Sequence, residues 1–364
     1  MIQTQLFTPA EATHYGDGTS VTQVAGRVGP GRFPAFHALA RATGGWYAEN
    51  TEGMSVERAM QAANLPARVD FQPFDQVPLI TEAGVESLSY PGSQGTYAIY
   101  PDGTRRGLGT VRKRYTIVQP EELAALGEAI TYQSDGAIVA AGSYGDPVGS
   151  RMFLAFKLPE GFTVGGEDLH DRYFTLINSF DGSTSLRALF APLRLTCTNQ
   201  VEATFGKLAN RVDIRHTGKI TDKIDRVLEA LRIAYDWTAA WKVESEKLLA
   251  TPMNATEVTA FVDKLMPTPA TTITAKGEKL WTERRSAIID LALRGENNDF
   301  GRGSAYAVNN AVSEFADHHA QVRAGQGTNA DRQRRTTIRR AVRLLDADAA
   351  ALKVRATNLL LASA

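Results

Sequence analysis

A change in the spacing of apolar residues near Gly218 constrains the fold more than any other feature of this sequence. Before it, from about Val69, short apolar runs alternate with Gly, Pro and Asp, which is typical of strands and hairpins. After it, apolar residues recur at helical spacing, as between Ile224 and Leu248. Because the strands come first and the helices second, the sequence predicts an α+β protein. We expect a mostly antiparallel sheet in the N-terminal half, followed by a helical C-terminal half.

The same pattern divides the chain into three regions. We expect an irregular N-terminal segment at residues 1–53, a β-rich α+β domain at 54–218 and a helical region at 219–364. A chain of 364 residues is long enough for more than one hydrophobic core.

Local signals place several elements within these regions. Ser55 is a suitable N-cap for a helix over Ser55–Ala63, because its side-chain oxygen can accept a first-turn N–H. Asp102-Gly103 supplies the positive φ angles of a tight turn, so residues 96–111 should form a hairpin. A further strand is expected at Arg114–Gln119 and a long final helix at Asp331–Leu361.

Composition restricts the setting of the protein. The single cysteine, Cys197, excludes an internal disulfide, and it lies in a strand-like run where a free cysteine is usually buried. No apolar run approaches the roughly 18 residues of a membrane span, and no signal region opens the chain. We therefore expect a cytoplasmic protein with no membrane partner.

The formal net charge is zero, yet the cations are unevenly distributed. A first basic segment follows the expected hairpin turn, and a second forms a stripe along the final helix, opposite an apolar face that includes Ile338 and Ala341. These two segments are the candidate nucleic-acid-binding residues: Arg105, Arg106, Arg112, Lys113 and Arg114, then Arg332, Arg335, Arg339 and Arg343. An ordinary solvated face is the alternative for the helix. Nearby Tyr97, Tyr100 and Tyr115 could stack on bases or be buried strand residues.

Catalytic and metal-binding patterns are weak. Asn178–Arg187 is rich in polar groups, but Asp181-Gly182 is also typical of a tight turn that needs glycine. No histidine is spaced to activate Ser183 or Cys197. The residues Glu314, Asp317, His318 and His319 could hold a metal, although a solvated helix end is the favoured interpretation.

The glycine-rich stretches do not predict a cofactor site either. Gly142–Gly149 lacks the Gly-Lys-Ser/Thr ending of a phosphate-binding loop, and Gly301–Ser304 is more typical of a helix cap. We expect no cofactor and no bound metal. Enzymatic activity stays open, with a non-enzymatic role favoured.

Residues 172–218 contain a characteristic series of polar, turn and cysteine residues: Asn178, Asp181, Gly182, Ser183, Arg187, Pro192, Arg194, Cys197, Asn199 and His216. In this order they resemble a family of uncharacterised phage/plasmid-like proteins. Phe180 and Ala191 depart from the family pattern, which has histidine and threonine at these places. The similarity continues more loosely over most of the chain after about Glu52, and it implies a phage-infected or plasmid-bearing bacterial host.

Together these features favour a non-enzymatic DNA-binding protein of phage or plasmid recombination or replication. The order of a basic hairpin and helices is broadly similar to phage single-strand annealing proteins, which makes single-stranded DNA the expected partner and leaves a homo-oligomer open. Two alternatives stay open. One is a phage interaction module, virion-associated or inhibiting a host factor, and the other is an enzyme with a polar pocket around Asp181, Ser183, Arg187 and Arg194.

Overall fold

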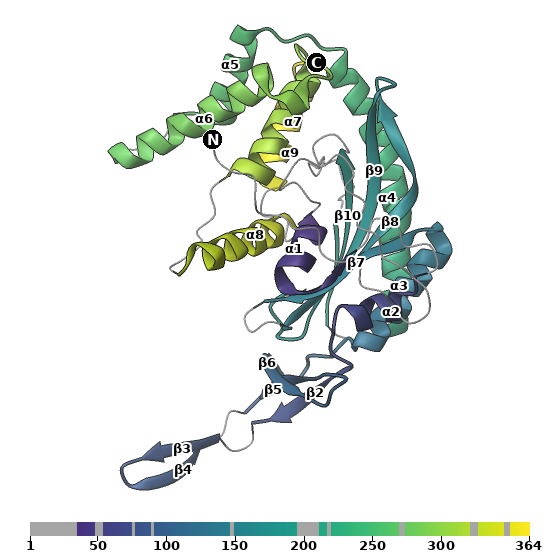
Figure 1. Cartoon of the computed structure of the whole chain (residues 1–364), viewed down its shortest axis with the longest axis vertical. Helices are drawn as coiled ribbons and strands as arrows, with labels where there is room; N and C mark the ends of the chain where they lie inside the picture. The colour runs from purple at the N-terminus through teal and green to yellow at the C-terminus, as the bar shows by residue number, and fades with distance from the viewer. Residues whose placement is uncertain are drawn as a thin grey trace.

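A computed structural model of the chain describes most of its residues, in ten ranges. These ranges are 35–47, 54–74, 77–88, 91–145, 149–194, 211–216, 220–268, 274–320, 327–345 and 350–364. Antiparallel sheets occupy the N-terminal half and helices the C-terminal half, which confirms the α+β class (Figure 1). Within these ranges, no helix combines the length and apolar character that crossing a membrane requires.

The centre of the molecule is a six-stranded antiparallel sheet, which we call the large sheet. Both of its faces are covered. Eleven of the twelve residues of its central strand β9 are buried. A strand that is covered on both faces carries a near-continuous buried run instead of an alternating one. In spatial order its strands are β1 (Trp46–Tyr47), β7 (Ala137–Tyr144), β8 (Arg151–Val164), β9 (Asp168–Ser179), β10 (Leu186–Arg194) and β11 (Arg211–Ile214).

Helices cover the two faces of the large sheet with separate hydrophobic clusters (Figure 1). On one face, Phe36 of α1 (Ala35–Thr43) and Ala341 of α8 (Asn329–Leu345) join a cluster with Phe153. On the other face, α2 (Val56–Ala62), α3 (Pro120–Ser134) and α4 (Ile220–Leu249) pack with Phe156.

The remaining helices gather at one end of the large sheet and continue the second cluster (Figure 1). Tyr306 and Val308 of the fully buried α7 contribute to this core. The helices at this end are α5 (Ala255–Leu265), α6 (Ala275–Arg294), η1 (Glu296–Asn298), α7 (Ala305–Glu314), the π-helical turn η2 (Phe315–His319) and α9 (Ala350–Leu361).

A second sheet of three strands, which we call the small sheet, lies at the opposite end (Figure 1). It has the order β2 (Arg68–Pro73), β5 (Ser93–Ile99) and β6 (Arg105–Arg112). The predicted β5–β6 hairpin is confirmed: Thr104 N donates to the Asp102 carboxylate over 2.8 Å, and Gly103 has a φ of +82°. Beyond β2, the hairpin of β3 (Val77–Thr81) and β4 (Gly84–Leu88) projects away from the rest of the molecule (Figure 1).

The predicted N-cap at Ser55 is confirmed, and a second N-cap at Asn254 likewise depends on neighbouring residues alone. Ser55 accepts the N–H of Arg58 over 3.2 Å at the start of α2. At the start of α5, Asn254 accepts the N–H of Glu257, whose carboxylate accepts the N–H of Asn254 in return. This reciprocal pair is a capping box.

The strand predicted at Arg114–Gln119 is wrong. Tyr115 N donates to Arg112 O over 2.9 Å, so the chain turns immediately after β6. Gln119 then hydrogen-bonds with its side chain to both backbone groups of Val69 and precedes α3. These partners take the place of a neighbouring strand.

The single helix predicted at Asp331–Leu361 is also wrong, because the structure has two helices there, α8 and α9. The two helices pack against different neighbours. Ala341 of α8 packs in the cluster with α1, whereas Ala356 and Leu360 of α9 pack in the cluster with α7.

Candidate nucleic-acid interface

The first basic segment lies on the small sheet and in the turn that follows it. All five of its side chains are exposed: Arg105, Arg106, Arg112, Lys113 and Arg114. Arg105 and Arg112 begin and end β6, so their backbones lie about 23 Å apart at ~3.3 Å per residue. The structure therefore brings these five predicted residues onto one hairpin, with cations at both ends of the strand.

A groove of about 570 Å³ runs over the same hairpin. It combines two guanidinium groups, two aromatic rings and several glycines. The residues that line it are Gln72, Phe74, Gly95, Thr96, Tyr97, Arg105, Arg106, Gly107, Leu108, Gly109 and Thr110. Cations beside an open, partly aromatic groove are the combination by which proteins hold single-stranded nucleic acids.

Only one of the three predicted stacking tyrosines lines this groove. Tyr97 is half-buried there, as the stacking interpretation requires. Tyr100 is buried in the core, and the Arg106 guanidinium lies over its ring at 5.6 Å. Tyr115 stacks on His216 with ring centroids 4.7 Å apart and donates its hydroxyl to Ser179 O. For Tyr100, the buried interpretation holds.

The Asp181-Gly182 turn lies directly under the small sheet. Ser183 N donates to the Asp181 carboxylate over 2.8 Å, and Gly182 has a φ of +71°, which confirms the predicted turn and its need for glycine. The Ser183 hydroxyl accepts a hydrogen bond from Arg151 Nε over 2.9 Å. Asp181 and Ser183 are therefore engaged in the structure of the turn.

The turn also braces the hairpin that bears the cations. Thr96 of β5 donates its hydroxyl to Phe180 O over 2.7 Å. A Cβ at Gly109 of β6 would lie 2.5 Å from the Asp181 Cβ, so the strand approaches the turn as closely as a glycine permits. Burial raises the pKa of the Tyr115 hydroxyl well above its usual range, which keeps this donor protonated toward Ser179.

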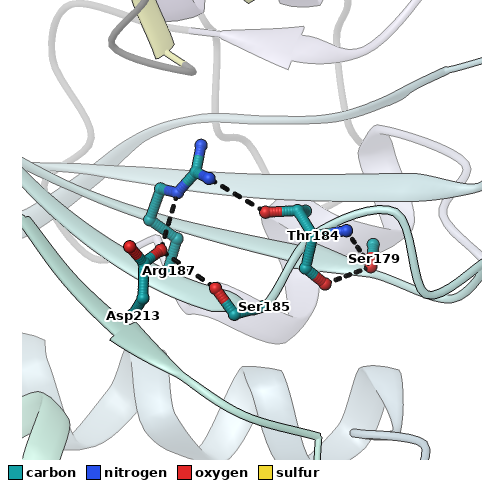
Figure 2. Close-up of polar contacts among 5 residues, drawn as sticks. All are labelled: Ser179, Thr184, Ser185, Arg187 and Asp213. Carbon is teal, nitrogen blue, oxygen red and sulfur yellow. Dashed lines mark hydrogen bonds and ion pairs between the residues drawn. The ribbon is translucent and has the colours of Figure 1, made fainter.

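Arg187 anchors the other side of the same turn (Figure 2). Its Nε lies 3.0 Å from Asp213 Oδ1 on the neighbouring strand, and its guanidinium also donates to the Thr184 hydroxyl over 3.0 Å. Ser185 donates to the same Asp213 oxygen, and the Ser179 hydroxyl donates to Thr184 O over 2.6 Å (Figure 2). The polar groups of this loop are thus engaged in hydrogen bonds with one another and with the neighbouring strand.

The other residues of the family resemblance extend this arrangement. Asn178 is buried and donates to Val118 O over 3.1 Å, and the buried ring of His216 lies 3.3 Å from Thr116 O. Phe180 is fully buried, so an apolar ring suits this position. The backbones of Pro192 and Arg194 pair with β9, while their side chains, together with Cys197 and Asn199, lie outside the described residues. The prediction of a buried Cys197 stays a prediction.

The second basic segment lies on α8, apart from the small sheet (Figure 1). Its predicted apolar face is confirmed, since Ile338, Ala341 and Val342 belong to the cluster beside α1. Of the predicted arginines, Arg332 and Arg339 are exposed, whereas Arg335 and Arg343 are half-buried. The two basic segments therefore do not form one continuous patch on neighbouring elements.

The solvated helix end predicted at Glu314–His319 is wrong for its two carboxylates. Glu314 is buried and accepts hydrogen bonds from the side-chain amides of Asn297 and Asn298 over 2.7 and 3.3 Å. Asp317 forms an ion pair of 2.6 Å with Lys353, with side-chain exposures of 1% and 0%. The helix α9, which carries Lys353, covers this end. Among the described residues, no three His, Cys, Asp or Glu side chains gather closely enough to hold a metal ion.

Sequence reasoning missed a second buried polar link. Tyr306 of α7 donates its hydroxyl to the Asp168 carboxylate of β9 over 2.6 Å. The ring of His170 stacks on Phe162 at 4.7 Å, with its Nε2 3.4 Å from the Tyr306 oxygen. This link joins residues far apart in the sequence, and it ties the large sheet to the helical half.

Sequence reasoning also missed Phe74, Gly95, Gly107 and Gly109 in the groove. Gly107 and Gly109 nevertheless carry a signal in the sequence, because both stand inside an expected strand. Glycine inside a strand weakens it, and commonly marks a bulge or a close approach of another group. Gly107 and Gly109 flank a register shift of this kind between β5 and β6.

The comparisons with known proteins identify a family of uncharacterised domains. A family model described as "Domain of unknown function (DUF932)" matches residues 107–337, from β6 through the Asp181-Gly182 turn into α8. No curated protein and no solved structure matches the chain. The match covers more than half of the 364 residues, so the chain belongs to this family of uncharacterised domains.

Proposed function

We propose that this chain binds single-stranded DNA without catalysis, in the recombination or replication of a phage or plasmid genome. The observation that carries the proposal is the β5–β6 hairpin with the turn that follows it, which present five exposed cations, two of them lining an open groove. Cations of this kind contact the phosphates of a strand whatever its sequence. The phage or plasmid setting is supported by the family resemblance of residues 172–218. A role in strand annealing is supported by the broad similarity of a basic hairpin followed by helices to phage single-strand annealing proteins.

The chemistry of the Asp181 loop supports binding over catalysis. Asp181, Ser183 and Arg187 are the described members of the alternative enzyme site, and each makes hydrogen bonds within the loop or to adjoining strands. A nucleophile needs a neighbouring base, and a carboxylate that caps a turn is poorly placed to become one. The loop instead supports the hairpin from beneath.

A titration of labelled oligo(dT) by fluorescence anisotropy at several salt concentrations tests the proposal. We expect binding that weakens as salt rises. The triple substitution Arg112→Gln, Lys113→Gln and Arg114→Gln should weaken binding at low salt and reduce the slope of log K against log salt by about 2, at ~0.7 per phosphate contact on a single strand. Circular dichroism would verify the fold.

A matched control removes the same charge elsewhere. Lys276, Lys279 and Arg284 are exposed on α6 in the helical half, so their replacement by glutamine lowers the net charge equally. This control should bind nearly as tightly as the unaltered chain. Equal weakening by both triple variants would attribute binding to overall charge, and no binding at low salt would overturn the proposal.

A second candidate, the interaction module, is favoured by the projecting β3–β4 hairpin. Ile80 and Val85 face each other across its two strands and are 84% and 72% exposed. An exposed apolar pair on a projecting hairpin is suited to contact with another protein. Absence of DNA binding together with stable association of this hairpin with a phage or host protein would favour this candidate.

A further inference from the structure

The three glycines of the groove have different surroundings. A Cβ at Gly95 would meet the ring of Phe74 at 2.8 Å, and one at Gly109 would meet Asp181 at 2.5 Å. These two glycines are explained by packing. A Cβ at Gly107 would meet no atom within 4 Å in the part of the chain that the structure describes, apart from its own chain neighbours, and its φ is not positive. Neither packing nor backbone geometry therefore requires glycine at position 107.

Gly107 is directly opposite Tyr97 across the β5–β6 ladder. Side chains of directly opposed residues stand on the same face of a sheet, about 5 Å apart at their Cβ atoms. The neighbours Thr96 and Ala98 are buried, so Tyr97 and Gly107 face outward into the groove. Since Gly107 has no side chain, it leaves the space beside the Tyr97 ring open.

The rest of the groove supplies a second ring and positive charge. Phe74 lies over Gly95 at one side, and Arg105 and Arg106 line the end nearest Gly107. Arg105 is two residues from Gly107 and stands on the same face of the strand, whereas the Arg106 guanidinium lies over the Tyr100 ring. Aromatic rings bind nucleobases by stacking, and guanidinium groups bind the adjoining phosphate. Gln72 and Thr110 add polar groups that could meet the edge of a base. An apolar ligand would not need the two arginines.

We propose that the space over Gly107, beside Tyr97, is a subsite for one unstacked base of a DNA single strand, whose phosphate lies against Arg105. The inference rests on the proposed function and makes it more specific. It implies that part of the affinity comes from a base as well as from the phosphates. It also gives a reason for glycine at position 107, because any larger side chain would fill the subsite.

The experiment compares two labelled oligomers of equal length, one of oligo(dT) and one in which every base is replaced by an abasic spacer. Both carry the same phosphates. The unaltered chain should bind oligo(dT) about tenfold more tightly, within the range measured for stacking of one base on an aromatic ring. Gly107→Val should remove this preference and leave binding of the abasic oligomer unchanged.

Substitutions at Tyr97 supply the matched pair. Tyr97→Phe retains the ring and should keep the preference for oligo(dT), whereas Tyr97→Leu should lose it. A melting curve for each variant verifies that the small sheet is intact. Addition of thymidine monophosphate distinguishes a strand from a free nucleotide: displacement of oligo(dT) at equal base concentration would overturn the assignment to a strand.

The outcomes separate this inference from the function on which it rests. If neither oligomer binds at low salt, the proposed DNA binding itself is wrong. If both bind equally and Gly107→Val has no effect, DNA binding stands and the base subsite is wrong. A preference for oligo(dT) that Gly107→Val abolishes and Tyr97→Phe preserves supports both.

Discussion

The large sheet and the small sheet use polar residues in opposite ways. Around the large sheet, buried charged groups are paired: Lys353 pairs with the buried Asp317, and the buried Arg187 pairs with Asp213 at the surface. On the small sheet, five cations and a groove lie at the surface. Buried charge is retained only when it is paired, whereas exposed charge remains able to attract a partner. The contrast directs the search for function to the small sheet.

The largest effect on stability should come from breaking a buried ion pair in the region around the large sheet. Lys353→Ala leaves the buried Asp317 carboxylate without its cation, which should lower the free energy of unfolding by about 3–5 kcal/mol. Urea denaturation measures this change. As a control, Lys353→Met combined with Asp317→Leu should recover much of the loss, because it removes both charges. Equal stability of the single variant would show that the pair contributes nothing.

The second prediction concerns how the stability of the region around the large sheet changes with pH, through His37 of α1. Burial lowers the pKa of this histidine from 6.5 to about 4. The unfolded chain therefore binds a proton more readily than the folded one between these pH values, so the contribution is present above pH 6.5 and is lost as pH falls toward 4. The loss should be on the order of 2–3 kcal/mol.

His37→Phe is the control for this pH dependence. It has no titrating group, so its stability should change less between pH 7 and pH 4 than that of the unaltered chain. Thermal melts at several pH values make the comparison. Parallel curves for the two proteins would assign the acid sensitivity to other groups.

The sharpest contrast within the small sheet is between two glycines two residues apart. Gly109→Val forces a side chain against Asp181 and should cost about 1–3 kcal/mol of stability. Gly107→Val places the same side chain in open space, and valine favours strands, so stability should change by no more than about 0.5 kcal/mol. Melting temperatures would compare the two. A large loss for Gly107→Val would mean that the groove face is packed.

Features that depend on a few adjacent residues could be predicted from the sequence. The Ser55 cap, the Asp102-Gly103 hairpin and the Asp181-Gly182 turn all have the expected geometry. Each rests on a hydrogen bond within three residues or on the freedom of glycine at positive φ. The order of strands before helices also follows from local periodicity, which is why the α+β class could be predicted.

Features that depend on distant partners could not. The residues that form the groove come from β2, β5 and β6 and from Phe74 directly after β2, and Phe74 meets Gly95 only because these strands pair. Glu314 and Asp317 have the composition of a solvated helix end, yet α9 buries them by bringing Lys353 to Asp317. Periodicity marks the face that a helix buries, but it does not identify the partner on that face.

The sequence thus carries the local code of this protein: its turns, its caps, its element types and the two basic segments. Contacts between residues far apart in the chain decide which basic segment lies beside a groove. They also decide which polar residues are paired inside the molecule. Arg187 illustrates the difference. In sequence it is a polar residue in a candidate site, and in the folded chain the adjacent strand supplies Asp213, which engages its charge. Pairing of this kind is set by chain topology, and a local pattern does not record it.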